Sequence, residues 1–117
     1  MYREKLAMMK NTYRTIYGAI AGDIIGSMYE FRSVKSKDFE LFPYGACFTD
    51  DTVMTLAIAR WLMEDVTRSE YTLVDTMCEF GNRYPAVGYG GLFCNWLCND
   101  QPPITHGGMV PLCVLVR

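Results

Sequence analysis

Apolar residues recur at helical spacing in four stretches of the chain, and no stretch alternates convincingly between apolar and polar positions. The pattern therefore predicts an all-α fold without strands. The strongest apolar stripe begins just after Thr49 and ends near Asp65, which predicts an amphipathic helix there. Its members, at positions i, i+3, i+4, i+7 and i+8, are Met54, Ala57, Ile58, Trp61 and Leu62.

A second helix is predicted from Ile16 to Met28, where the apolar residues again fall on one stripe. Asp23 lies on that same stripe. Because a buried carboxylate is costly unless it is paired, Asp23 is expected to have a hydrogen-bonding or charged partner.

Two further helices are predicted in the second half of the chain. One follows Ser69, the expected N-cap, and is predicted to stop at Gly81. The other is short and runs from Phe93 to Leu97. Residues 31–48, in contrast, mix charge, proline and glycine without a sustained period, so we expect an irregular connection there.

The composition is that of one globular domain of 117 residues, with 50% hydrophobic and 21% charged residues. A net charge of −2 without any Lys/Arg cluster argues against nucleic acid or an anionic membrane as partner. No window approaches the roughly 20 apolar residues of a membrane span. The chain is therefore expected to be soluble and cytoplasmic, with a small-molecule or protein partner.

Five cysteines without a CxxC pair predict neither a disulfide framework nor a zinc knuckle. Cys94 and Cys98 are four residues apart and share a predicted helix face. We interpret them as buried small hydrophobic residues in preference to metal ligands.

Two adjacent acids, Asp50 and Asp51, stand between Thr49 and Thr52 at the start of the strongest helix. With Thr49 as N-cap, both acids lie in the first turn, where the helix dipole stabilises a carboxylate by about 0.3–1 kcal/mol. Capping does not explain why two mutually repelling acids are adjacent, or why Thr52 stands where a capping box has Glu or Gln. A hard divalent cation would explain the pair, because Mg²⁺ and Mn²⁺ bind carboxylate and hydroxyl oxygens. The pattern alone leaves both interpretations open.

The segments GAIAGDIIGSMYEF (18–31) and FTDDTVMTLAIA (48–59), in this order and spacing, resemble the amino-terminal part of the ADP-ribosylglycohydrolase family. That family includes the enzyme that reactivates dinitrogenase reductase. The segment YPAVGYGGLFCNWL (84–97) is similar to the next part of the family, so the resemblance covers most of residues 16–100. It implies an all-helical domain around a binuclear Mg²⁺ or Mn²⁺ centre, which cleaves the glycosidic bond between ADP-ribose and a protein side chain.

The resemblance also implies roles for single residues. Thr49, Asp50 and Asp51 match the family's first metal-binding cluster, and Glu30 matches a catalytic acid on a mobile loop beside the metals. Asp23 matches the acid of the family's Gly-Asp motif, as a substrate contact or as a structural hydrogen-bond acceptor.

Gly88, Tyr89 and Gly90 are expected to line the ADP-ribose cleft, where small residues let backbone amides approach phosphate. A glycine-rich turn between two helices, however, needs no ligand.

The implied chemistry is hydrolysis at C1″ of ribose, which builds oxocarbenium character. Two ions held by aspartates would orient the ribose hydroxyls and lower the pKa of the attacking water, and Glu30 would handle a proton. The implied substrate is an ADP-ribosylated protein or a small molecule that contains ADP-ribose.

The resemblance ends near Asp100, and no second Asp/Asp/Thr cluster follows to complete the metal site. The family continues with a segment like PYNSWGNGSAMRVSP, which suitable codons for residues 102–117 spell when they are read one nucleotide out of register. We therefore expect residues 1–101 to be the N-terminal part of an ADP-ribosylglycohydrolase-like domain and residues 102–117 to be a frameshifted tail outside the family fold. On this view the chain is a truncated, inactive hydrolase.

Two other functions stay open. One is a non-catalytic, crystallin-like or interaction module of the same family. The other is an unrelated helical bundle, in which Asp50 and Asp51 contribute only to stability.

Overall fold

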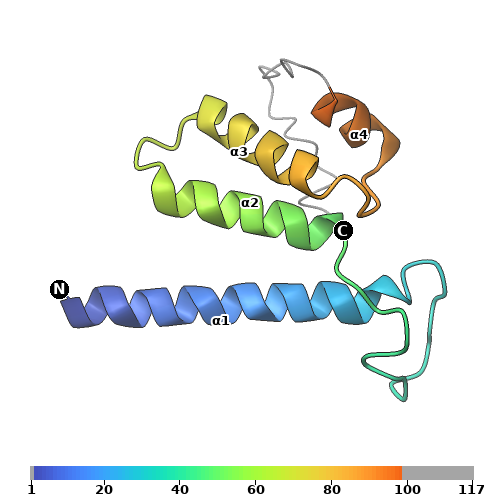
Figure 1. The fold of residues 1–117 in the computed structure, drawn as a ribbon. Coiled ribbons are helices and arrows are strands. Elements are labelled where there is room, and N and C mark those ends of the chain that lie inside the picture. Colours follow the sequence, from blue (N-terminus) through green and yellow to red (C-terminus); the bar gives the residue numbers. More distant parts are fainter. Residues whose placement is uncertain (1, 99–117) are drawn as a thin grey trace. The chain divides into compact units, whose positions relative to one another are not determined.

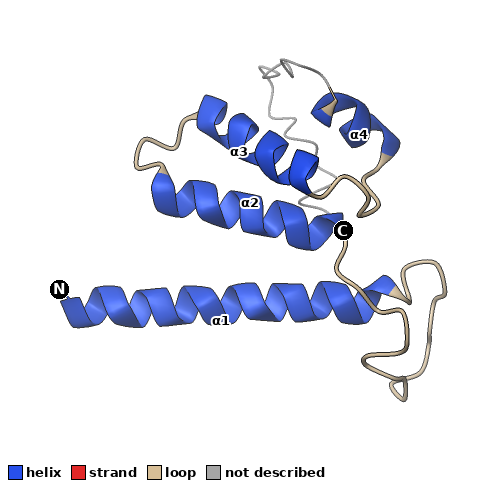
Figure 2. Cartoon of the chain, viewed as in Figure 1, coloured by secondary structure: helices blue, strands red, loops and turns tan. Residues whose placement is uncertain are grey.

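The computed structural model describes residues 2–98, and this part of the chain is all-helical, as the sequence predicts. Its elements are α1 (Tyr2–Ser27), α2 (Asp50–Glu64), α3 (Glu70–Arg83) and α4 (Gly91–Leu97), which follow one another along the chain (Figure 1). Loops and turns join the helices, and no strand occurs between residues 2 and 98 (Figure 2). Within the same residues, every helix is too short or too polar to cross a membrane.

The chain divides into two compact units, and the boundary falls inside α2, between Thr52 and Val53. The N-terminal unit contains α1, the following loop and the first residues of α2. The C-terminal unit contains the rest of α2 with α3 and α4.

Helix α1 is longer than its apolar stripe predicts, because it begins at Tyr2 and not near Ile16. Residues 3–10 are mostly Arg, Glu, Lys, Leu, Ala and Met. These residue types have high intrinsic helix propensity. The helix therefore extends through a segment in which no apolar periodicity indicates it.

The irregular connection predicted for residues 31–48 is confirmed. Side-chain contacts attach it to the end of α1. The N–H of Cys47 donates to Ser27 Oγ (3.3 Å). The hydroxyl of Tyr29 donates to the carbonyl oxygen of Glu40 (2.6 Å), and the Tyr29 ring packs edge-on against Phe39, with 5.3 Å between the ring centroids. These contacts bring the chain back to the end of α1 just before α2 begins.

A core of apolar side chains joins the three helices of the C-terminal unit. Its buried members are Val53, Met54, Ala57, Met77, Phe93 and Leu97. Phe93 also stacks on Trp96, with 5.4 Å between the ring centroids. The predicted stripes of α2 and α3 supply Met54, Ala57 and Met77 of this core. Val53 lies outside the predicted stripe, Leu62 of the stripe is exposed, and α4 adds Phe93 and Leu97.

Helix α3 begins where the sequence predicts but ends later. Ser69 is its N-cap, since the Ser69 side chain accepts a hydrogen bond from the N–H of Tyr71. The prediction that Gly81 ends the helix is wrong, because α3 continues to Arg83 and Gly81 is buried within it. A Cβ atom at Gly81 would lie 2.7 Å from Leu97 Cδ1, so the glycine makes room for α4.

The prediction for Cys94 and Cys98 is also wrong, because both side chains are exposed. Phe93 and Leu97 are the buried residues of α4, and the two cysteines lie outside the core.

Candidate functional site

The carboxylate of Asp23 anchors the start of α2. It accepts four hydrogen bonds, two from backbone N–H groups and two from hydroxyls. Thr49 donates its N–H to Oδ2 (2.7 Å) and its hydroxyl to Oδ1 (2.6 Å). Thr52 donates its N–H (3.3 Å) and its hydroxyl (2.6 Å) to Oδ2. The expectation that this acid is hydrogen-bonded is confirmed, and the bonds are of the kind that a structural role requires.

Thr49 caps α2 as the sequence predicts. Its hydroxyl oxygen accepts a hydrogen bond from the N–H of Asp51 (3.3 Å) while its proton points to Asp23. Thr49 therefore links two carboxylate-bearing residues, one on α1 and one in the first turn of α2.

Thr52 belongs to this group of residues, although in the sequence it stands out only as a departure from the capping box. Its side chain is buried, with 6% of its surface exposed. In a capping box the carboxylate comes from the third residue of the helix itself. Here Asp23 of α1 supplies that carboxylate, so the third helical position requires a donor, and Thr52 provides a hydroxyl. The absence of Glu or Gln at this position was the signal in the sequence.

Asp50 and Asp51 both lie in the first turn of α2, where Asp50 is half-buried and Asp51 is exposed. Burial raises the pKa of Asp50 above its ordinary value, and the negative charge of Asp51 raises it further. The charge of Glu30 acts in the same direction, whereas hydrogen bonds from the Asp50 backbone and from Thr49 oppose the shift. The charges of Asp51 and Glu30 thus both act on the Asp50 carboxylate.

Glu30 comes from the turn that ends α1. Its N–H donates to the carbonyl oxygen of Gly26 (3.0 Å), so the backbone at Glu30 is fixed to the last turn of the helix, while its side chain is exposed. The charge of Glu30 acts on Asp50, and the predicted role of Glu30 beside a metal site stays a prediction.

The donor set suits a hard divalent cation in its chemistry. Thr49, Asp50 and Asp51 present a hydroxyl and two carboxylates at one helix start, and a bound cation would relieve the repulsion that raises the pKa of Asp50. The set is partial, however. Among residues 2–98, no three or more Asp, Glu, His or Cys side chains lie close enough together to hold a metal ion.

Gly88, Tyr89 and Gly90 lie in the C-terminal unit, directly before α4. Gly88 has φ +93°, a conformation that residues with a Cβ rarely adopt, and Gly90 is the N-cap of α4. The Tyr89 ring packs against Phe93, with 5.6 Å between the ring centroids. The turn therefore explains the two glycines and the core explains Tyr89. The predicted contact with ADP-ribose stays a prediction.

A cleft of about 610 Å³ opens in the loop of the N-terminal unit. Its lining comes from both sides of Glu30 in the sequence and consists of Met28, Tyr29, Arg32, Ser33, Val34 and Pro43. The guanidinium of Arg32 and the hydroxyl of Ser33 are polar groups suited to an anionic ligand. The residues of this cleft have no regular spacing, so the sequence pattern does not predict it.

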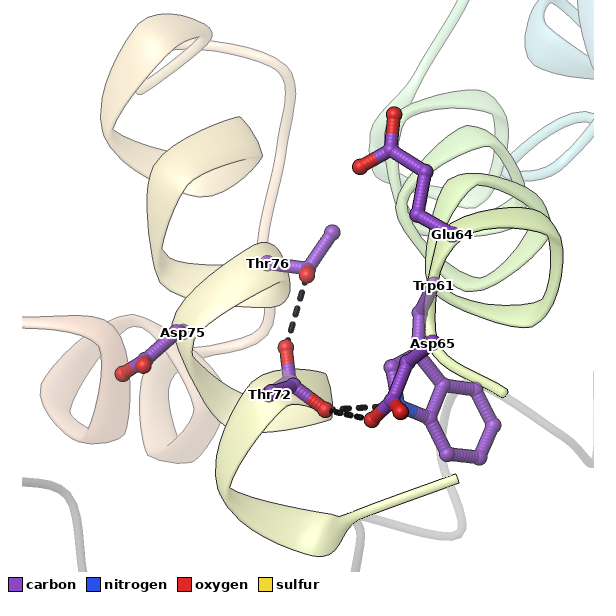
Figure 3. A pocket seen from close by; sticks show the side chains of 6 residues that line it. All are labelled: Trp61, Glu64, Asp65, Thr72, Asp75 and Thr76. Atoms are coloured by element: carbon purple, nitrogen blue, oxygen red, sulfur yellow. Dashed lines mark hydrogen bonds between the residues drawn. The ribbon is translucent and has the colours of Figure 1, made fainter. Parts of the chain in front are cut away.

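A second pocket, of about 350 Å³, lies where α2 and α3 are joined (Figure 3). Its lining includes three acids and is made up of Trp61, Glu64, Asp65, Thr72, Asp75 and Thr76. Asp65 accepts hydrogen bonds from the hydroxyls of Thr67 and Thr72, which lower its pKa far below the ordinary value. Through these hydrogen bonds the Asp65 carboxylate links the end of α2 to α3.

The sequence matches the ADP-ribosylglycohydrolase family over residues 6–106. That match spans most of the chain and extends into the segment for which a frameshifted tail is predicted. Residues 102–117 lie outside the described residues. The all-helical fold and the acid-bearing start of α2 agree with the match, and the chain belongs to the ADP-ribosylglycohydrolase family. Membership supports an ADP-ribosylglycohydrolase-like function in general.

No curated protein and no solved structure matches the chain.

Proposed function

We propose that the chain takes part in a metal-dependent hydrolysis that removes ADP-ribose from modified protein side chains. Thr49, Asp50 and Asp51 are its contribution to a binuclear Mg²⁺ or Mn²⁺ site. The single observation that carries the proposal is that the chain belongs to this family and presents Thr49, Asp50 and Asp51 together at the start of α2. A cytoplasmic location fits the composition and is part of the same proposal.

The chain's own residues divide the work. Oxygens of Thr49, Asp50 and Asp51 hold the cations, which when bound supply positive charge that orients the ribose hydroxyls. The carboxylate of Glu30 takes a proton from the attacking water as the bond from C1″ to the side-chain nitrogen or oxygen breaks. The Glu30 carboxylic acid then returns that proton to the departing nitrogen or oxygen, so the side chain is released with its proton and the Glu30 carboxylate is regenerated.

Substrate contacts come from groups that suit an anionic dinucleotide. Arg32, in the cleft beside Glu30, pairs with diphosphate oxygens. Backbone amides of the turn formed by Gly88, Tyr89 and Gly90 provide a second set of donors.

The partial ligand set has a direct consequence. Because the described residues supply too few acids to enclose two ions, we propose that the 117-residue chain binds divalent cations weakly and does not turn substrate over by itself. The remaining ligands would lie outside residues 2–98.

A second candidate is a non-catalytic interaction module of the same family. The observation that favours it is a set of exposed aromatic residues in the loop of the N-terminal unit, with Phe31 88%, Phe42 60% and Tyr44 102% exposed. Such side chains commonly mark a surface for a protein partner.

The test compares the 117-residue chain with a frame-restored protein, in which one base is inserted or deleted near codon 102 to restore the family segment. ADP-ribosylated protein is incubated with each in the presence of Mg²⁺ or Mn²⁺, and released ADP-ribose is measured. We expect release by the frame-restored protein only, and loss of release in its Asp50→Asn variant.

Release by the 117-residue chain would refute the claim that it is inactive. An inactive frame-restored protein that still folds would refute the hydrolase proposal and favour the interaction module. If no single-base change restores the family segment, the frameshift interpretation is wrong.

A further inference from the structure

Two cysteines at the end of α4 share one exposed face. Cys94 and Cys98 are four residues apart, and both are exposed. Residues at this spacing lie on the same side of an α-helix, one turn from each other. The N–H of Cys98 donates to the carbonyl oxygen of Cys94 (3.0 Å), so the helical spacing holds as far as Cys98. The two thiols are therefore neighbours at the surface of the C-terminal unit.

The other cysteines among residues 2–98 are placed differently. Cys78 is partly buried against the core, and burial raises the pKa of its thiol, which slows its reaction with oxidants. Cys47 is exposed, but the sequence of the N-terminal unit contains no second cysteine. Exposed thiols that oxidise reversibly commonly stand next to a second cysteine, which resolves the first oxidation product. Cys94 and Cys98 meet both conditions.

The backbone at the end of α4 permits a bond between the two sulfurs after a small movement. Cα atoms four residues apart in an α-helix are separated by about 6 Å, within the range of about 4.4–6.8 Å that disulfides span. The Cβ atoms, about 5–6 Å apart, must approach to about 3.5–4.5 Å. Cys98 is the residue that can move, because it is the C-cap and follows the last helical residue, Leu97.

We propose that Cys94 and Cys98 form a reversible redox site, which a peroxide oxidises to a disulfide. This site shares no residue with the proposed hydrolase function. In compartments that keep thiols reduced, disulfides are mostly transient and redox-sensing, and a pair at the surface is open to both oxidant and reductant.

The oxidation has two steps. The sulfur of one cysteine attacks a peroxide oxygen: the O–O bond breaks, the sulfur becomes a sulfenic acid, and the other oxygen leaves as water with the thiol proton. The second thiol attacks that sulfur, so that the S–S bond forms, the S–O bond breaks and the OH group leaves as water with the second thiol proton. Two small-molecule thiols restore the reduced pair and become a disulfide themselves.

The disulfide acts on the packing of α4 against α3 through Leu97. This side chain is 6% exposed, and a Cβ at Gly81 of α3 would lie only 2.7 Å from it. A shift of Cys98 toward Cys94 also moves Leu97, and so close a contact tolerates little movement. The cross-link closes a very short loop, so its stabilising effect on the unfolded state is small. Oxidation is therefore expected to destabilise the C-terminal unit.

The experiment treats the 117-residue chain with a small excess of hydrogen peroxide and maps disulfides by mass spectrometry, after cleavage between Cys94 and Cys98 without reduction. We expect an intrachain link between these two cysteines that dithiothreitol reverses. Thermal unfolding of the oxidised chain should show a melting temperature lower by roughly 4–8 °C, the shift expected for one disturbed core contact in a domain of this size. Dithiothreitol should restore the original value, which separates the disulfide from methionine oxidation.

The matched variants are Cys98→Ser and Cys47→Ser. Cys98→Ser should form no link, should carry a sulfenic acid at Cys94 that dimedone traps, and should keep its melting temperature after peroxide. Cys47→Ser should behave as the native chain does. Links from Cys94 or Cys98 to other cysteines or to a second chain, in place of the expected link, would overturn the proposal, as would oxidation that stops at sulfenic or sulfinic acids. A Cys94–Cys98 link that leaves the melting temperature unchanged would refute the effect on α4.

Discussion

The hydroxyl of Thr52 donates to Asp23 Oδ2 at 2.6 Å, although the two residues are 29 positions apart in the sequence. This bond and the three others to Asp23 attach the first turn of α2 to α1. They hold in place the turn that carries Asp50 and Asp51. The two acids are therefore presented by a helix start whose position depends on a third acid.

Thr52→Val tests this anchor. Valine has nearly the same shape but donates no hydrogen bond, so the carboxylate of Asp23 loses one of its four partners. A hydrogen bond to a charged group contributes about 1.5–3 kcal/mol, and we expect a loss of that order in the free energy of unfolding. Urea unfolding followed by circular dichroism measures it. Thr52→Ser keeps the hydroxyl and should lose less than half as much; equal losses would contradict the role of the hydroxyl.

The raised pKa of Asp50 predicts how the free energy of unfolding changes with pH. Its pKa in the folded chain lies above the ordinary value of 3.8, so the folded state binds the Asp50 proton more tightly than the unfolded state does. Its favourable contribution to stability is complete well below pH 3.8 and is lost as the pH rises through the raised pKa. Asp50→Asn, which cannot ionise, should therefore be more stable than the native chain at neutral pH and equally stable in acid.

The stability of the native chain and of Asp50→Asn is also measured with Mn²⁺ present. Millimolar Mn²⁺ at neutral pH should stabilise the native chain and have less effect on Asp50→Asn, because the cation offsets the repulsion between neighbouring carboxylates. A variant that is less stable than the native chain at neutral pH would show that helix-dipole attraction outweighs this repulsion.

Much of the secondary structure follows from local patterns. The stripe that begins at Met54 and the cap at Ser69 predicted α2 and the start of α3, because both signals lie within one or two helical turns. The early start of α1 was missed, since helix propensity without an apolar stripe gives no periodic signal. Gly81 was misread because a glycine near a helix end can either stop the helix or admit a neighbour, and only the position of Leu97 distinguishes the two.

The contact between Gly81 and Leu97 supplies a third prediction. Gly81→Ala gains about 1 kcal/mol in helix propensity, but its Cβ would lie 2.7 Å from Leu97 Cδ1 and 2.8 Å from Cδ2. Because overpacking costs about 1–3 kcal/mol, we expect a net loss of roughly 1 kcal/mol in the free energy of unfolding. Fluorescence of the tryptophans during urea unfolding reports it.

A double-mutant cycle identifies the cause. In a Leu97→Ala background the obstructing methyl groups are gone, so Gly81→Ala should become neutral or stabilising. An unchanged penalty in that background would place the strain elsewhere in α3.

Asp65 lies in the C-terminal unit. We expect its effect on stability to change with pH in the opposite direction to that of Asp50. Hydrogen bonds from Thr67 and Thr72 lower its pKa, so its contribution to stability is present above the ordinary pKa of 3.8 and is lost only as the pH falls far below it. Asp65→Asn should therefore destabilise the C-terminal unit at neutral pH, with a difference from the native chain that shrinks in strong acid. Urea midpoints measured across the acid range check this, and a pH-independent difference would contradict it.

The sequence predicts the residues of the candidate site but not the hydrogen bonds that join them. The run Thr49, Asp50 and Asp51 is recognisable in sequence because its members are adjacent and stand at a helix start. The bonds from Asp23 to Thr49 and Thr52 were not, because they join positions 26 and 29 residues apart through a loop without regular structure. The hydrogen-bonding requirement of Asp23 was evident, whereas the identity of its partners depended on where that loop returns.

Glu30 is the residue for which the proposed chemistry makes its most specific prediction. In the frame-restored protein, Glu30→Gln keeps the size of the side chain but removes the proton acceptor, so kcat should fall by about 10²–10⁴-fold. KM for the ADP-ribosylated substrate and Mn²⁺ affinity should change by less than about threefold, since Glu30 is exposed in the turn after α1 and is not one of the proposed metal ligands. Steady-state rates of ADP-ribose release and a parallel Mn²⁺ titration measure the three quantities.

The matched variant is Asp51→Asn, which should lower Mn²⁺ affinity and lose activity that excess Mn²⁺ partly restores. The two acids are both exposed and both lie in the N-terminal unit, so a general loss of stability would affect them alike. If Glu30→Gln instead weakens Mn²⁺ binding and is rescued by excess Mn²⁺, Glu30 acts as a metal ligand and the proton must be handled by another group. If neither variant loses activity, the acids at this helix start only stabilise the fold.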